Sequence, residues 1–184
     1  AVDSLSLELE NLIRASENGE LLKEGIHTVI TGKPNAGKSS LMNVLIGKER
    51  AIVTEVAGTT RDILEGQVNL DGITLNLIDT AGIHEAQDAV EKIGIEKARN
   101  SLDRADLVVF VVDASTEFDR DDKEVLSLLG NKNVIFLLNK CDLVQVTTEG
   151  KIRSIINEKG MACPVIAVSA KEGTGIDELS RQIK

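Results

Sequence analysis

Apolar and polar residues alternate in blocks along most of the chain, and these blocks predict strands and helices in turn. Short apolar runs are typical of strands buried on both faces, and apolar residues three or four apart are typical of helices. The expected strands cover residues 27–31, 63–70, 73–79, 107–113, 134–139 and 165–168. The expected helices cover residues 38–46, 91–102, 119–129, 148–159 and 176–183. This order predicts an α/β fold with a mostly parallel six-stranded sheet and helices on both faces.

One neighbouring pair of strands is expected to be antiparallel. Asp71-Gly72 separates residues 63–70 from residues 73–79, and this dipeptide is a strong signal for a tight hairpin turn. The sheet should therefore have one antiparallel edge strand. At the end of the helix expected over residues 38–46, Gly47 is placed to cap the C-terminus.

The first 24 residues differ from the rest of the chain. Leu5, Leu9, Leu12 and Ile13 recur at helical spacing and are followed by a polar stretch. We expect a helical segment and a connector over residues 1–24, and one folded domain over residues 25–184. The amphipathic helix is expected to pack on a missing neighbour, which would make the chain an excised piece of a longer protein.

Composition narrows the classes of function. The 184 residues include 21 Lys and Arg against 30 Asp and Glu, a net charge of −9, so extensive contact with nucleic-acid phosphates is not expected. With no Trp, no Tyr and three Phe, the chain has few rings on which bases can stack. Two distant cysteines and two histidines do not form a zinc-binding pattern. Because we find no membrane span and no secretory signal, we expect a cytoplasmic location without membrane contact.

A glycine-rich loop follows the first expected strand. The segment Gly32-Lys33-Pro34-Asn35-Ala36-Gly37-Lys38-Ser39 fits the phosphate-binding pattern G-x-x-x-x-G-K-[ST] between a strand and a helix. Its two glycines allow successive backbone N–H groups to face phosphate oxygens, at the positive end of the following helix. Lys38 supplies a charge for the β- and γ-phosphates, and the Ser39 hydroxyl can bind Mg²⁺. The loop predicts nucleotide binding.

Two later segments indicate which base is bound. Asn139-Lys140-Cys141-Asp142 follows a buried strand, and the Asp142 carboxylate can accept from guanine N1–H and the 2-amino group, which adenine lacks. Asn139 can join neighbouring loops, and the stem of Lys140 can cover the ring. In Ser169-Ala170-Lys171, the Ala170 N–H can be offered to guanine O6. The pattern favours GTP and GDP over adenine nucleotides.

Two further segments are candidates for sensing the γ-phosphate. In Asp79-Thr80-Ala81-Gly82, Asp79 can hold Mg²⁺ through water and the Gly82 N–H can touch the γ-phosphate. In Gly58-Thr59-Thr60-Arg61-Asp62, Thr60 is a candidate for a second hydroxyl ligand of Mg²⁺. Loss of the γ-phosphate would release both loops, which is a switch. Ile83 stands where Ras-type GTPases place a water-orienting Gln, so catalysis must come from elsewhere in the chain, a partner or a cation.

The assembled motifs resemble the GTPase domain of the MnmE (TrmE) family of tRNA-modification proteins. The resemblance covers residues 25–184 and is carried by residues 32–40, 51–62, 79–83 and 90–96. Its more specific marks are Pro34-Asn35-Ala36 and the segment Glu91-Lys92-Ile93-Gly94-Ile95-Glu96. It implies a P-loop NTPase G-domain fold. The implied nucleotide-binding residues are Asn35, Ala36, Gly37, Lys38, Ser39, Ser40, Thr59, Thr60, Asp79, Gly82, Asn139, Lys140, Asp142, Ser169, Ala170 and Lys171.

The resemblance also implies a mechanism. MnmE-like domains form homodimers through their nucleotide faces, driven by K⁺, and here the Asn35 side chain and the Thr54 and Val56 carbonyls would bind that ion. Glu91 would orient the attacking water, so that Glu91, Lys38 and Asn35 form the catalytic set, and Ser39, Thr60 and Asp79 would bind Mg²⁺. The simpler alternatives are that Glu91 is a helix-start acid stabilised by the helix dipole, and that Asn35 is a spacer.

The resemblance places other functions outside this chain. Full-length relatives have further domains, and they modify the wobble uridine of tRNA together with a partner flavoprotein. Two alternatives remain: a ribosome-assembly GTPase of the Era/Der type, and a nucleotide-dependent scaffold with little turnover. The acidic charge disfavours the first, because such proteins carry basic RNA-binding appendages, whereas Ile83 supports the second.

Overall fold

Six strands form a single sheet in the computed structural model, which describes residues 25–48, 65–70, 72–79 and 100–184. The strands are β1 (Ile26–Thr31), β2 (Glu65–Leu70), β3 (Ile73–Asp79), β4 (Leu107–Asp113), β5 (Val134–Asn139) and β6 (Val165–Ala167). Their order is β2-β3-β1-β4-β5-β6, and within the described ranges only β2 and β3 pair antiparallel. The mostly parallel sheet with one antiparallel edge strand is therefore confirmed.

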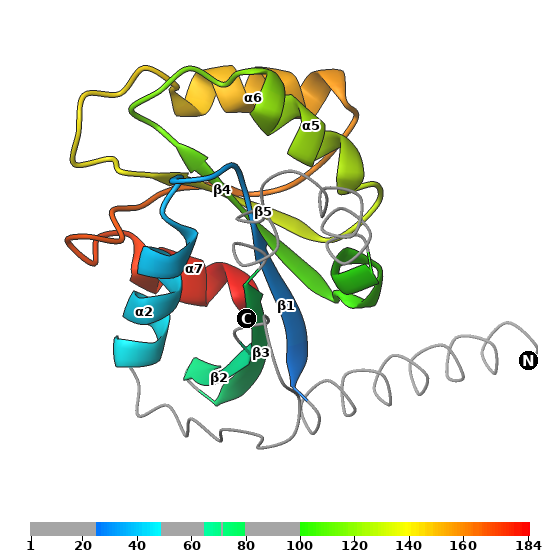
Figure 1. Ribbon diagram of the computed structural model, residues 1–184, viewed down its shortest axis with the longest axis vertical. Coiled ribbons are helices and arrows are strands. Elements are labelled where there is room, and N and C mark those ends of the chain that lie inside the picture. Colours follow the sequence, from blue (N-terminus) through cyan, green and yellow to red (C-terminus); the bar gives the residue numbers. More distant parts are fainter. Residues whose placement is uncertain (1–24, 49–64, 71, 80–99) are drawn as a thin grey trace, which may run out of the picture.

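Helices cover both faces of this sheet. The named helices are α2 (Lys38–Lys48), α5 (Arg120–Leu128), α6 (Glu149–Glu158) and α7 (Ile176–Ile183), and residues 100–104 are also helical. Figure 1 shows α5 and α6 together on one side of the sheet, with α2 and α7 on the other. None of the helices in the described ranges has both the length and the apolar character needed to cross a membrane.

The central strands have two buried faces, as their uninterrupted apolar sequences predict. In β4, Val109 and Val111 belong to the apolar cluster that includes α2 and α7, whereas Val108, Phe110 and Val112 belong to the cluster that includes α5 and α6. Successive strand residues point to opposite faces, so the side chains of such a strand pack alternately against the two helical layers.

The hairpin forms at the expected position. Leu70 pairs with Ile73, and Gly72 between them has a φ of 94°. The Asn69 side-chain oxygen accepts the Gly72 N–H at 2.7 Å, which satisfies a donor in the tight turn. Asp71 lies outside the described residues.

Helix ends agree with the sequence pattern in some places and differ in others. Asp119 and Thr148 are the N-caps of α5 and α6, so the expected ranges 119–129 and 148–159 include the caps. The prediction for Gly47 was wrong: α2 continues through it to Lys48, and Gly47 lacks the positive φ that a left-handed cap needs. The helix expected to end at residue 102 continues to residue 104. Residues 1–24 lie outside the described ranges.

Candidate nucleotide-binding site

The phosphate loop lies at the carboxyl end of β1, and two of its positions accept only glycine. Gly32 has a φ of 148°, and a Cβ there would overlap the Val111 carbonyl oxygen. Gly37 has a φ of 98°, and a Cβ there would overlap the Asn139 side-chain amide. A side chain at position 32 would force the loop backbone away from β4, and one at position 37 would displace the Asn139 side chain at the end of β5. The loop is therefore built against the two strands that follow it across the sheet.

Lys38 begins α2 and turns its ammonium back across the loop. Its Nζ donates to the carbonyl oxygens of Gly32 and Lys33, each at 2.9 Å, and the residue is only 4% exposed. The cation is thus held at the centre of the loop, at the positive end of a helix, which is an arrangement that suits phosphate. Ser39 and Ser40, in the same first turn, are exposed.

Asn139, at the end of β5, connects two loops that are distant in sequence. Its Nδ2 donates to the Ala36 carbonyl oxygen at 2.8 Å, and its Oδ1 accepts the Ala170 N–H at 3.0 Å. This geometry confirms that Asn139 joins neighbouring loops. The Ala170 N–H is donated to Asn139 here, so binding to guanine O6 would require it to share this hydrogen bond.

Lys140 is held by the carboxylate of Asp113, which belongs to none of the predicted nucleotide-binding motifs. Lys140 has a φ of 64°, and its Nζ lies 2.5 Å from Asp113 Oδ2. Asp113 Oδ1 accepts from the Ser115 N–H at 2.9 Å and from the Ser115 hydroxyl at 2.6 Å. Burial alone would raise the pKa of Asp113, but the hydrogen bonds from Lys140 and Ser115 outweigh it and hold that pKa below its ordinary 3.8. The sequence feature that could have identified Asp113 is its position at the carboxyl end of a buried strand, where α/β sheets bind ligands.

The candidate base-recognition residue Asp142 is oriented by Ser169. The Ser169 hydroxyl donates to Asp142 Oδ1 at 2.7 Å and in turn accepts the Glu172 N–H at 3.2 Å. The hydrogen bond from Ser169 lowers the pKa of Asp142, so the carboxylate is ionised at neutral pH. Asp142 is exposed and Ser169 is buried, which leaves an anchored acceptor facing outward, beside exposed Lys171.

Part of the expected site lies outside the described residues. Asp79 ends β3, and its neighbour across the β1–β3 pairing is Ile30, two residues before Gly32, so its backbone lies at the same edge of the sheet as the phosphate loop. Asn35 is exposed on that loop, with a φ of 62°. The remaining expected positions are not described: Thr54, Val56, Thr59, Thr60, Gly82 and Glu91.

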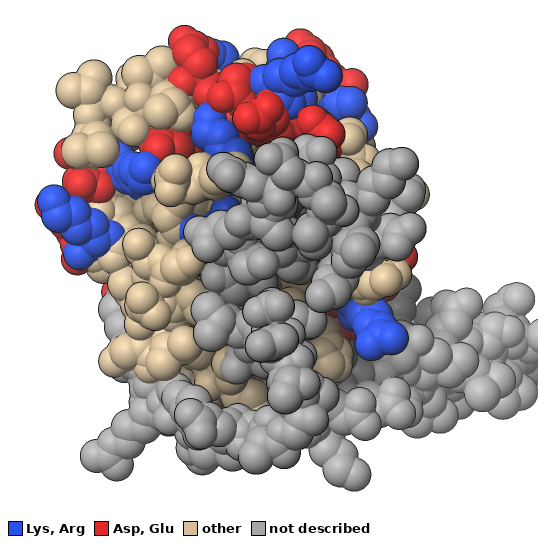
Figure 2. Space-filling view, in the orientation of Figure 1, with Lys and Arg blue, Asp and Glu red and all other residues tan. Residues whose placement is uncertain are grey.

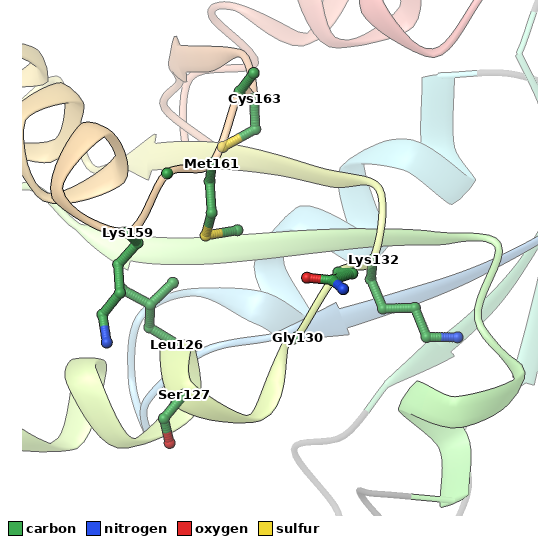
Figure 3. A pocket seen from close by; sticks show the side chains of 10 residues that line it. Leu126, Ser127, Gly130, Lys132, Lys159, Met161 and Cys163 are labelled. Atoms are coloured by element: carbon green, nitrogen blue, oxygen red, sulfur yellow. The ribbon is translucent and has the colours of Figure 1, made fainter.

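A pocket of about 330 Å³ lies at the opposite edge of the sheet. It is lined by residues 126, 127, 130–132 and 159–163, which precede β5 and β6, whereas the phosphate loop follows β1. Figure 3 shows Lys132 directed away from the other lining side chains; its Nζ donates to the carbonyls of Asp103 at 2.7 Å and Ala105 at 3.2 Å. Because parallel strands place their amino ends together, this pocket is not the nucleotide site.

Comparison with known proteins agrees with this geometry. Residues 27–140 match the family described as 50S ribosome-binding GTPase. The chain belongs to this GTPase family. It is 53% identical over 176 residues to the tRNA modification GTPase MnmE of Lachnoclostridium phytofermentans, covering 96% of this chain and 37% of that protein. It is 48% identical over 182 residues to MnmE of Acetivibrio thermocellus, covering 99% and 39%.

These relatives confirm the resemblance to the MnmE G domain, and the chain spans less than half of their length. Among solved structures, Aquifex aeolicus Era bound to GDP·AlF₄⁻ has 31% identity and a TM-score of 0.67, over 86% of this chain and 55% of Era. The G domain of the T. maritima FeoB iron transporter has 28% identity and a TM-score of 0.59, over 86% and 96%. The fold is that of a P-loop GTPase, and the activity of the family is hydrolysis of GTP.

Proposed function

We propose that this chain is the K⁺-stimulated GTPase module of a protein that modifies the wobble uridine of tRNA. The observation that carries the proposal is the 53% identity to MnmE over 96% of the chain. The tRNA and a partner flavoprotein would be bound by other parts of the full-length protein, which would act in the cytoplasm. The module would supply GTP binding, GTP hydrolysis and a homodimer contact across its nucleotide face.

The described residues fit guanine nucleotide binding. The loop N–H groups and Lys38 would hold the phosphates, because the buried ammonium already lies across the loop carbonyls. The anchored Asp142 carboxylate would accept from the guanine N1–H and 2-amino group. Lys140, fixed by Asp113, would cover the ring with its stem.

The residue types proposed as Mg²⁺ ligands suit this ion. Ser39 is exposed in the first turn of α2, and the backbone of Asp79 lies at the same edge of the sheet. Together with Thr60 they would supply hydroxyl and carboxylate oxygens, the ligand type that Mg²⁺ prefers. The ion, when bound, neutralises charge on the β- and γ-phosphates.

The K⁺ proposal rests on Asn35 and on the family resemblance. Asn35 is exposed on the phosphate loop and would offer its side-chain oxygen beside the phosphates, with the carbonyls of Thr54 and Val56 completing the ligand set. A cation there supplies the charge that an arginine finger supplies in other GTPases. Glu91 would orient the attacking water, since Ile83 has no polar group to do so.

A chimera tests the link to tRNA. Residues 25–184 would replace the G domain of Lachnoclostridium phytofermentans MnmE in bacteria that lack their own MnmE, and the nucleosides of total tRNA would be measured by mass spectrometry. We expect the modified wobble uridine to return, and a Lys38→Ala chimera to fail. A chimera that hydrolyses GTP normally but leaves the uridine unmodified would contradict the proposal.

Ribosome assembly is the second candidate function. Its support is the family description and the 32% identity, with a TM-score of 0.69, to Era in complex with MgGDPNP and nucleotides of 16S ribosomal RNA. Figure 2 shows acidic and basic side chains mixed over α5 and α6, so this face offers no uniformly basic surface to an RNA backbone. Co-sedimentation of the GTP-analogue complex with ribosomal subunits at 150 mM salt would favour this candidate.

A scaffold with little turnover, the third candidate, would require a negligible hydrolysis rate in saturating K⁺.

A further inference from the structure

Lys33, the second residue of the phosphate loop, is bound to the start of α5. Its Nζ donates to Asp122 Oδ2 at 2.9 Å, to Asp119 Oδ2 at 3.1 Å and to the Glu117 carbonyl oxygen at 3.3 Å. The Lys33 side chain is only 12% exposed. One ammonium therefore joins the phosphate loop to a helix more than 80 residues later in the sequence.

Asp122 is the buried partner in this contact. Its side chain is fully buried, and its Oδ2 also accepts the Asp119 N–H at 3.2 Å in the capping box of α5. Its Oδ1 is buried and has no hydrogen-bond partner among the described residues. Burial raises the pKa of Asp122, and the ammonium of Lys33 opposes that shift.

The negative charge of Asp122 exceeds what helix capping requires. A neutral Asn or Gln side chain at this position can also accept the N-cap N–H, and it avoids the cost of a buried charge. The structure pairs this carboxylate with Lys33. We therefore assign the negative charge of Asp122 to its contact with Lys33.

Lys33 connects this pair to the phosphate-binding cation. Its carbonyl oxygen accepts a hydrogen bond from Lys38 Nζ at 2.9 Å. We propose that Lys33 and Asp122 are positioning residues that fix this carbonyl, and thereby hold Lys38 where it meets the β-phosphate. The inference rests on the role of Lys38 in the proposed function, and it adds that the start of α5 sets the geometry of the phosphate loop.

The test compares affinities for GDP and GMP, because these nucleotides differ only in the β-phosphate. In Lys33→Met, we expect the ratio of the GMP Kd to the GDP Kd to fall about tenfold, equivalent to about 1.4 kcal/mol. A merely structural role would lower the melting temperature and leave the ratio unchanged, because destabilisation affects both complexes equally. Lys33→Arg retains the charge and both carboxylate contacts, so its ratio should stay within threefold of the parent.

A double variant separates stability from positioning. Lys33→Met leaves Asp122 buried without its cation, and this loss of compensation can impair folding. Lys33→Met with Asp122→Asn removes both charges, so the melting temperature should recover while the ratio stays low. Lys151→Met is the matched control. Lys151 pairs with Glu117, just before α5, and no contact between Lys151 and the phosphate loop is seen among the described residues. The ratio of the GMP Kd to the GDP Kd in Lys151→Met should therefore equal that of the parent.

Lys38→Ala makes the two possible failures distinguishable. If Lys38→Ala lowers the ratio while Lys33→Met and its double variant with Asp122→Asn stay within twofold of the parent, the positioning proposal is overturned and the role of Lys38 stands. If Lys38→Ala also leaves the ratio unchanged, the β-phosphate assignment fails, and the positioning proposal fails with it.

Discussion

The side-chain amide of Asn139 donates to the carbonyl oxygen of Ala36 at 2.8 Å, across 103 residues of sequence. The same side chain accepts the Ala170 N–H at 3.0 Å and is almost completely buried. The phosphate loop and the loop after β6 therefore share one neutral hydrogen-bonding group. We infer that the base and phosphate subsites are aligned by Asn139.

Asn139→Ala should weaken both nucleotide binding and stability. The substitution leaves a buried carbonyl and a buried N–H without partners, at a cost of about 1–3 kcal/mol each. We expect a markedly lower melting temperature and at least a tenfold weaker GDP affinity, measured by thermal unfolding and calorimetry. Asn157→Ala, at an exposed position of α6, is the control and should change neither. Parent-like affinity in Asn139→Ala would show that the two loops align without it.

Gly37→Ala should abolish nucleotide binding. The position combines a φ of 98° with direct approach of the Asn139 amide, so the added methyl strains the backbone and displaces the side chain that joins the loops. The control is Gly150→Ala in α6, where no atom lies within 4 Å of the added methyl. That control should be neutral or stabilising by up to about 1 kcal/mol, as for Gly to Ala in a helix. GDP binding by Gly37→Ala at parental affinity would contradict the loop geometry.

Asp142→Asn should change the preferred base. The amide cannot accept from both guanine donors, whereas xanthine presents a carbonyl to its N–H₂. Loss of a required hydrogen-bonding group can change affinity by about 10²–10⁴-fold, or roughly 3–5 kcal/mol. Competition between GDP and XDP measures the switch, with Glu158→Gln, at an exposed position at the end of α6, as control. If the parent protein bound ATP as tightly as GTP, Asp142 would have no role in base selection.

The Asp113 carboxylate should make the free energy of unfolding fall at acidic pH. Its folded-state pKa lies below its ordinary value of 3.8, so its contribution is fully present above that value and is lost as the pH falls through the folded pKa. Asp113→Asn should therefore lose less unfolding free energy than the parent between pH 6 and pH 3, measured by urea unfolding. Asp121→Asn, exposed on α5, is the control, and its pH profile should follow the parent's more closely. An unchanged slope in Asp113→Asn would mean that the pair with Lys140 adds no stability.

Much of the fold could be predicted because its signals are local. The apolar runs of β4 and β5, the Asp71-Gly72 turn and the capping residues Asp119 and Thr148 all act within a few residues of sequence. Gly47 is an exception, because glycine also occurs inside helices, and here α2 continues through it to Lys48. Sequence order also predicted that the segment from Asn139 to Asp142 would follow a buried strand, at the end of the sheet where ligands bind.

The interactions that support the site could not be predicted in this way. Asp113 binds Lys140 from a neighbouring strand, and Asp122 binds Lys33 from the start of a helix on one face of the sheet. Neither acid belongs to a nucleotide-binding motif, and in the sequence Asp122 reads as an ordinary acid in the first turn of a helix. Only the three-dimensional structure shows that it is fully buried beside a cation of the phosphate loop.

The central claim is that this domain hydrolyses GTP with the help of K⁺, and the most direct measurement is the single-turnover rate in KCl and in NaCl over a range of protein concentrations. We predict a faster rate in KCl that rises with protein concentration. Asn35→Ala should lose the K⁺ response. Glu91→Ala should reduce the hydrolysis rate by about 10²–10⁴-fold, with little change in its affinity for a GTP analogue. Equal rates in the two salts at every protein concentration would contradict the claim.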